Sequence, residues 1–143
     1  MGDIHIPVTR PGHRVPHSWI EHAGHRISTH DLTGASEAFV LITGSEGLPW
    51  IEAARKVATS MGISMRVARI GLGGEHTFDY VDASGQWDAF KGIDEDGSVL
   101  VRPDGYVAFR SKSMVVAPEQ VLTDVLSTVL GRDDDAVEIV RAA

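Results

Sequence analysis

The chain contains no cysteine. This absence excludes disulfides, thiolate metal ligands and cysteine nucleophiles together. No apolar run approaches the roughly 20 residues that cross a bilayer. At the N-terminus no basic region precedes an apolar core, and Ile6 stands where a myristoylation signal needs serine or threonine. We therefore expect a cytoplasmic protein that does not enter the membrane.

The chain also has few positive charges: it contains 13 lysines and arginines but 20 acidic residues, for a net charge of −7. An acidic surface repels phosphate backbones and anionic lipids, which argues against nucleic acid and membranes as partners. The remaining composition, 43% hydrophobic and 23% charged over 143 residues, is typical of one globular domain. The acidic run 133–135 is most simply solvated.

The clearest strand and helix lie in the first half of the chain. The apolar run 38–42 ends at a glycine and predicts a central strand that is buried on both faces. A helix is predicted from Pro49 to Gly62, because apolar residues repeat at i, i+3, i+4 and i+7. Residues 65–70 predict the next strand, and this order implies a parallel crossover.

Further elements surround this unit. Residues 17–28 predict a hairpin around the turn Ala23-Gly24. Residues 82–90 predict one or two helical turns, with Ser84 as the cap and Trp87 and Phe90 facing inward. Asp104-Gly105 between two β-rich runs predicts a second hairpin, spanning 98–110. Finally, Pro118 opens a helix with an apolar stripe that ends at Gly131.

This order predicts an α/β fold of thioredoxin-like pattern, in which helices flank a mixed central sheet. It has an extra N-terminal hairpin and no Cys-x-x-Cys motif. We expect residues 1–16 to form an arm or linker, 17–131 the domain and 132–143 a C-terminal tail.

Two segments carry a resemblance to a known family. Residues 11–17 resemble the Pro-Gly-x-Arg-x-Pro-His stretch that leads into the last domain of FAD-dependent aromatic-ring monooxygenases of the phenol, dichlorophenol and hydroxyphenylpropionate type. Residues 99–110, with their run Leu-Val-Arg-Pro-Asp-Gly, resemble the closing signature of the same domain. Shorter matches lie between the two: Ser28-Thr29, Asp31-Leu32, Phe39-Val40-Leu41, Asp79, Trp87 and Gly92-Ile93.

The resemblance implies a thioredoxin-like C-terminal domain without redox chemistry. It further implies that whole family members bind FAD, take electrons from NADPH and insert oxygen into a phenolic ring, with flavin and substrate held mainly in preceding domains. We therefore expect FAD-binding and substrate domains as partners, in the same or a separate chain, together with a possible homodimer. We expect this chain alone to be catalytically inactive and to bind no cofactor.

Several residues invite a catalytic or cofactor-binding interpretation, and none of them completes a site. The cluster 71–76 has His76 in place of the last glycine of a dinucleotide turn, so a loop is favoured. Ser45 precedes the predicted helix, but no base is evident beside it, which favours a simple turn. We therefore assign no catalytic, cofactor-binding or metal-ligating residue.

Histidines are concentrated in the N-terminal part, and a pair such as His22 and His25 has a spacing found in metal sites. On a hairpin, however, such side chains need not converge, and we interpret His17 as a docking or hydrogen-bonding residue. The cluster consists of His13, His17, His22, His25 and His30.

Other side chains are assigned by position. Trp50 and Trp87 are expected in the core, while Trp19, if exposed, would mark a surface that faces missing domains. Arg102 and Arg110 could pair with acidic neighbours or with a partner.

Three functions stay open on this basis. The first is a non-catalytic domain for packing, assembly or dimerisation of an aromatic-ring hydroxylase. The second is a stand-alone module that docks onto a separate flavoprotein or another partner. The third is a weak metal-dependent activity on the histidine-rich arm.

Overall fold

The structure, a computed structural model, describes residues 9, 11–33, 37–71, 80–82 and 85–131. This part of the chain forms seven strands and four helices. Their order is β1 (Trp19–His22), β2 (His25–Ser28), α1 (Thr29–Thr33), β3 (Phe39–Thr43), α2 (Leu48–Met61), β4 (Met65–Gly71), β5 (Tyr80–Val81), α3 (Gln86–Phe90), β6 (Ser98–Val101), β7 (Val107–Ser111) and α4 (Pro118–Val129).

One mixed sheet joins the strands in the order β2-β1-β5-β4-β3-β6-β7. β3 and β4 are parallel, with Phe39 opposite Met65, so the strand–helix–strand unit has the predicted parallel arrangement. β6 runs antiparallel to both β3 and β7, which confirms the hairpin around Asp104-Gly105. The N-terminal hairpin is also confirmed, since β1 and β2 are antiparallel from Trp19 opposite Ser28 to His22 opposite His25.

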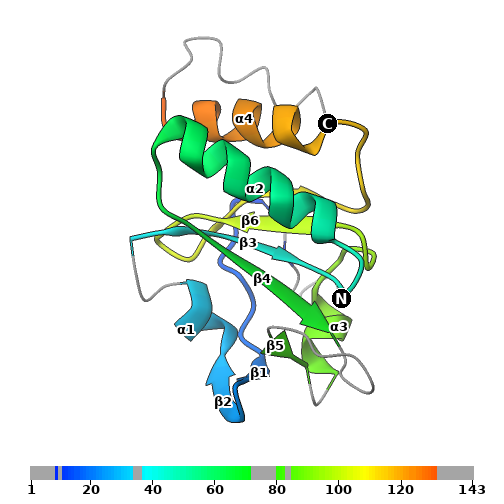
Figure 1. Cartoon of the computed structure of the whole chain (residues 1–143). Helices are drawn as coiled ribbons and strands as arrows, with labels where there is room; N and C mark the ends of the chain where they lie inside the picture. Colours follow the sequence, from blue (N-terminus) through cyan, green and yellow to red (C-terminus); the bar gives the residue numbers. More distant parts are fainter. Residues whose placement is uncertain (1–8, 10, 34–36, 72–79, 83–84, 132–143) are drawn as a thin grey trace, which may run out of the picture.

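Two helical layers enclose the central strands. Helices α2 and α4 cover one face, and the short helices α1 and α3 lie on the other side (Figure 1). All five residues of β3 are buried, as predicted, and their side chains alternate between two apolar clusters. Leu41 packs in the cluster below α2 and α4 with Trp50, and Ile42 packs in the opposite cluster with Trp87. Both tryptophans therefore lie in the core, as predicted.

The ends of α2 follow from its sequence. A proline stands in its first turn, and Gly62 ends it in the left-handed conformation, with φ 69° and its N–H bonded to Ala58. α4 begins at Pro118, as predicted, and buries Leu122 and Leu126. Among the described residues no helix is long and apolar enough to cross a membrane.

Two short elements were not predicted from the sequence. α1 has only five residues, too few to show an apolar period. β5 has two, and it exists because Tyr80 pairs with Ile70 of β4 while Val81 pairs with Glu21 of β1. The expectations for Ser84, for residues 72–76 and for the tail 132–143 lie outside the described residues, as does the side chain of Phe90.

The segment we expected as an arm or linker packs onto the sheet. Gly12 N–H donates to the carbonyl of Val107 over 2.8 Å, and Val107 N–H donates to the carbonyl of His13 over 2.8 Å. Val15 is buried in the core. Residues 11–15 therefore cover the outer edge of β7, which would otherwise be left unpaired. That this segment links to a further domain stays a prediction.

Candidate functional site

The loop from β3 to α2 is the place where a thioredoxin-like fold would hold its redox cysteines. Here its sequence is Gly44-Ser45-Glu46-Gly47, and it forms the turn into the helix that we predicted. A Cβ on Gly44 would lie 2.6 Å from the carbonyl oxygen of Glu95, and one on Gly47 would collide with the side chain of Thr43. Gly44 therefore lets the loop close against the segment before β6, and Gly47 lets it turn tightly against the end of β3.

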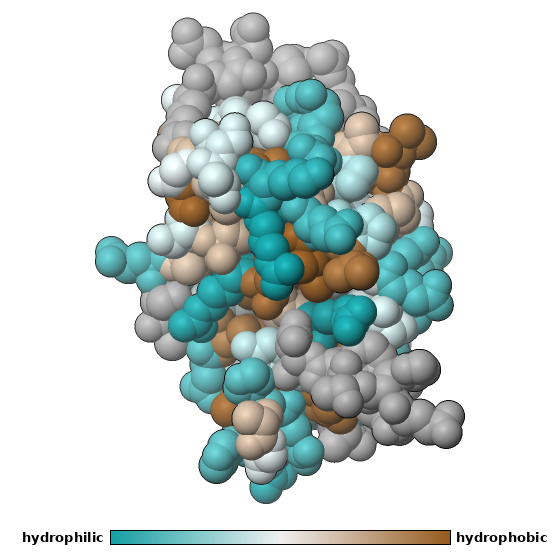
Figure 2. Space-filling model, in the orientation of Figure 1, coloured by the Kyte–Doolittle hydropathy of each residue, from teal (hydrophilic) through white to brown (hydrophobic). Residues whose placement is uncertain are grey.

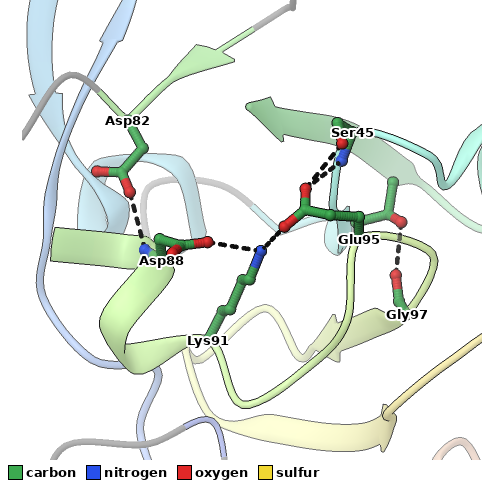
Figure 3. Close-up of polar contacts among 7 residues, drawn as sticks. Ser45, Asp82, Asp88, Lys91, Glu95 and Gly97 are labelled. Carbon is green, nitrogen blue, oxygen red and sulfur yellow. Dashed lines mark hydrogen bonds and ion pairs between the residues drawn. The ribbon is translucent and has the colours of Figure 1, made fainter. Parts of the chain in front are cut away.

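A charged cluster, made of Ser45, Asp82, Asp88, Lys91 and Glu95, occupies this region (Figure 3). Ser45 donates to Oε1 of Glu95 twice, from its N–H over 3.0 Å and from its hydroxyl over 2.8 Å. The other oxygen of Glu95 pairs with the ammonium of Lys91. That ammonium also lies 2.9 Å from Oδ1 of Asp88.

The electrostatics of the charged cluster keep both members of the central pair ionised. Burial alone would raise the pKa of Glu95, but the hydrogen bonds from Lys91 and Ser45 outweigh it and lower that pKa. Burial alone would likewise lower the pKa of Lys91, but Asp88 and Glu95 outweigh it and raise that pKa. A carboxylate with a depressed pKa is a weak proton acceptor, which makes Glu95 a poor general base for Ser45.

Sequence reasoning missed this partner of Ser45. Glu95 is 50 positions away along the chain, so only the fold brings the two together. A weak local signal did exist, since Lys91 and Glu95 have the i, i+4 spacing of an ion pair. The charged cluster joins four segments: the β3–α2 loop, the residue after β5, α3 and the loop that follows α3.

Asp82 anchors the start of α3. Its Oδ2 accepts the N–H of Asp88 over 2.8 Å. The side chain is buried, and its Oδ1 has no hydrogen-bond partner among the described residues. Beside it is a cavity of about 10 Å³, lined by Trp87, Lys91 and Glu95 among others. That volume holds about one water molecule. It is far too small for an aromatic substrate.

The five N-terminal histidines do not converge. The rings of His17 and His30 lie 5.7 Å apart, and His30 donates to the carbonyl of Val15 over 2.8 Å. His22 instead stacks on Tyr80 at 4.6 Å. Within the described part of the chain, no group of three or more histidine and acidic side chains is arranged to hold a metal ion.

The two segments that carry the family resemblance, far apart in sequence, meet in space. Arg14 forms a β-bridge with Tyr106, and Val15 N–H donates to the carbonyl of Gly105 over 3.0 Å. Gly105 has a φ of 88°, which the turn requires and other residues rarely adopt. Residues 11–15 therefore close over the β6–β7 turn.

The two arginines that flank this turn differ in their surroundings. Arg102 pairs with Asp104, with Nη2 and Oδ2 2.6 Å apart. Of the two kinds of partner expected for Arg102, an acidic neighbour or another protein, the structure shows the acidic neighbour. The Asp104 carboxylate raises the pKa of this guanidinium further. Arg110 lies against Gly92, where a Cβ would meet its guanidinium.

Comparison with known proteins agrees with this geometry. A thioredoxin-like protein from Porphyromonas gingivalis superimposes over 85% of this chain and 93% of its own, with a TM-score of 0.57 and 11% identity. This likeness supports the fold alone. Fold and site together define a thioredoxin-like domain in which a charged cluster stands at the position of the dithiol.

The sequence match is more specific. Residues 8–133 match the family model of the aromatic-ring hydroxylase C-terminal domain, and the chain belongs to this family. It is 41% identical to phenol 2-monooxygenase of Pseudomonas sp. (strain EST1001), over 86% of this chain and 19% of that protein. It is also 36% identical to 2,4-dichlorophenol 6-monooxygenase of Cupriavidus pinatubonensis (strain JMP 134 / LMG 1197), over 96% of this chain and 22% of that protein.

A solved structure extends this comparison. The flavin-dependent monooxygenase PieE, in complex with FAD and substrate, superimposes with a TM-score of 0.78 and 39% identity, over 91% of this chain and 21% of its own. The chain thus spans about a fifth of the length of the relatives that it matches.

Proposed function

We propose that this chain is the C-terminal, non-redox domain of an FAD-dependent aromatic-ring hydroxylase, and that it serves packing, assembly or dimerisation rather than catalysis. The observation that carries the proposal is the charged cluster at the position of the dithiol. Its central pair, Glu95 and Lys91, is held ionised, and its serine donates to a weakly basic carboxylate.

The charged cluster serves the fold well. It ties the β3–α2 loop to α3 and to the segment before β6, through hydrogen bonds of 2.8–3.0 Å from Ser45 and the ion pairs of Lys91. The cavity beside it admits about one water molecule. Such an arrangement fits a rigid scaffold better than a site that must open for a substrate.

The chemistry of the whole enzyme then belongs to other domains, in the same or a separate chain. In this proposal they bind FAD, accept electrons from NADPH and hold a phenolic substrate. The family membership of this chain supports the aromatic substrate, and the PieE structure, which contains FAD and substrate, supports the flavin.

The test uses the protein in its natural host. An affinity tag is added to the chromosomal gene, and the purified material is assayed for FAD absorbance and for NADPH oxidation stimulated by phenols. We expect FAD and a flavoprotein sequence to accompany the chain, fused to it or as a second polypeptide. Purification of the chain with no flavoprotein would contradict the proposal.

The non-catalytic role has its own test in the same purified enzyme. Ser45→Ala and Lys91→Met remove the hydroxyl and the ammonium of the charged cluster. We expect turnover per bound FAD to stay within about twofold, because general acid–base groups typically contribute 100-fold or more. A loss of about 100-fold with unchanged FAD content would show that the domain takes part in catalysis.

A further inference from the structure

One large aromatic side chain stands on a surface that helices α2 and α4 leave uncovered. Trp19 is 45% exposed on the outward face of the β1–β2 hairpin. Helices α2 and α4 cover the central strands but do not extend over this hairpin (Figure 1). The neighbouring residue Ile20 points the other way and is buried in the core.

The exposed ring is held in place by its neighbours. The edge of His17 meets it at 4.7 Å and 87°, and the guanidinium of Arg26 lies 5.3 Å from the ring centroid. His17 is itself fixed, because its Nδ1 lies 2.6 Å from the hydroxyl of Ser28. An anchor that is already ordered loses little conformational entropy on docking. Tryptophan and arginine are also the residues that most often dominate binding energy at interfaces.

This surface and the start of the described chain both contact helix α3. The N–H of Trp19 donates to Oε1 of Gln86 over 3.4 Å, at the first residue of α3. Thr9 donates to the carbonyl of Lys91, which caps the other end of that helix. Since α3 has five residues and a helix rises about 1.5 Å per residue, its two ends are about 8 Å apart. Thr9 and the hairpin therefore contact the two ends of the same short helix.

We propose that the Trp19 face, formed by His17, Trp19 and Arg26, docks onto the FAD-binding and substrate part of the hydroxylase. The inference rests on the proposed function. This occupant is favoured because the family is a C-terminal domain and the chain spans about a fifth of its relatives, so that their remaining length comes first. Covalent connection ahead of Thr9 keeps that part at a high effective concentration near α3 and the hairpin.

The opposite side of the molecule offers a weaker surface for docking. The outward residues of α2, such as Glu52, Arg55 and Lys56, are exposed and charged. Figure 2, in the orientation of Figure 1, shows hydrophilic side chains interspersed with apolar patches over the part of the surface where α2 lies. The side chain of Leu48, at the start of α2, is 48% exposed and provides a matched control for Trp19.

Site-specific photo-crosslinking in the natural host tests the proposal. p-Benzoylphenylalanine is introduced at Trp19 in one strain and at Leu48 in another, and crosslinked peptides are sequenced. We expect position 19 to crosslink to a FAD-binding sequence, within the same polypeptide or a second one, at ten or more times the yield of position 48. Crosslinks to that sequence from position 48 alone would leave the proposed function standing and overturn the assigned face.

Two further outcomes contradict the proposal in different ways. A crosslink from position 19 to a second copy of this chain would make the face a self-association surface. No flavoprotein crosslink from either position would count against the proposed function itself. Trp19→Ala serves as the folding control, and we expect its melting temperature to stay within about 3 °C of the parent, as for an exposed residue. Unfolding of this variant would place Trp19 in the core and overturn the inference.

Discussion

The two sides of the central sheet are held by different interactions. On one side, α2 and α4 bury a continuous apolar cluster that includes Leu41, Trp50 and Leu100. The other side also has an apolar cluster, but its covering segments are short and are fixed by polar contacts between distant residues. Thr29, for example, donates to the carbonyl of Pro16 over 2.7 Å and accepts the N–H of Ser18 over 3.0 Å.

The two sides of the sheet therefore contribute differently to the fold: one mainly stabilises it, and the other mainly fixes the positions of its segments. Apolar burial is non-directional and tolerates shifts of one helix against the sheet. Hydrogen bonds and ion pairs depend on geometry, and a buried polar group left unpaired costs about 1–3 kcal/mol. The polar side therefore fixes segments too short to hold their own position.

The largest effect is expected in the apolar layer. Leu100→Asp places a carboxylate on a fully buried position of β6, so we expect the domain to unfold. Circular dichroism and a thermal melt measure the outcome. Val116→Asp is the matched control, because that valine is fully exposed, and it should melt like the parent. A folded Leu100→Asp protein would contradict the assignment of β6 to the core.

A polar substitution on the other side should have the next largest effect. Thr29→Val keeps the shape but removes both hydrogen bonds of a fully buried hydroxyl. We expect a loss of about 2–3 kcal/mol in the free energy of unfolding, measured with urea. Thr59→Val, at an exposed position of α2, should change little. Equal effects at the two sites would remove the contrast between the layers.

The charged cluster allows a comparison of two lysine ion pairs. Lys91→Met removes a buried ammonium, with a side chain 9% exposed, and we expect a loss of about 1–2 kcal/mol. Lys56→Met breaks the pair with Glu119 across α2 and α4, where the two side chains are 69% and 56% exposed. That change should cost about 0.5 kcal/mol or less. Urea unfolding of both variants measures whether the buried lysine contributes more to the free energy of unfolding than the exposed one.

The pH dependence of the Lys91→Met effect should follow from the two shifted pKa values. The folded pKa of Glu95 lies below its ordinary value of 4.5, so its contribution is present above that pH and is lost as the pH falls through the folded pKa. The folded pKa of Lys91 lies above 10.5, so its contribution is complete below that pH and is lost as the pH rises through the folded pKa.

We therefore expect the stability difference between parent and Lys91→Met to stay constant from about pH 5 to pH 10 and to shrink below that range. Urea unfolding at a series of pH values measures it. A difference that persists unchanged as the pH falls well below the ordinary carboxylate pKa of about 4 would show that packing of the lysine stem, rather than the ion pair, stabilises the domain.

The sequence by itself determined the elements whose order defines the fold. The apolar run 38–42, the periodic helix before Gly62 and the turn at Asp104-Gly105 each carry a local signal, because burial and backbone geometry repeat with the period of a strand, helix or turn. The absence of cysteine excludes thiol chemistry from composition alone, whatever the fold.

The tertiary structure alone decided the site and the partners of its residues. Glu95 and Ser45 are in contact although they are 50 positions apart in sequence. The two residues of β5 form a strand because they pair with β1 and β4. Likewise, residues 11–15 have the sequence of an arm but pair with β7. The physical reason is the same in each case. Polar contacts between distant segments leave no period in the sequence, so only the folded chain shows which donor meets which acceptor.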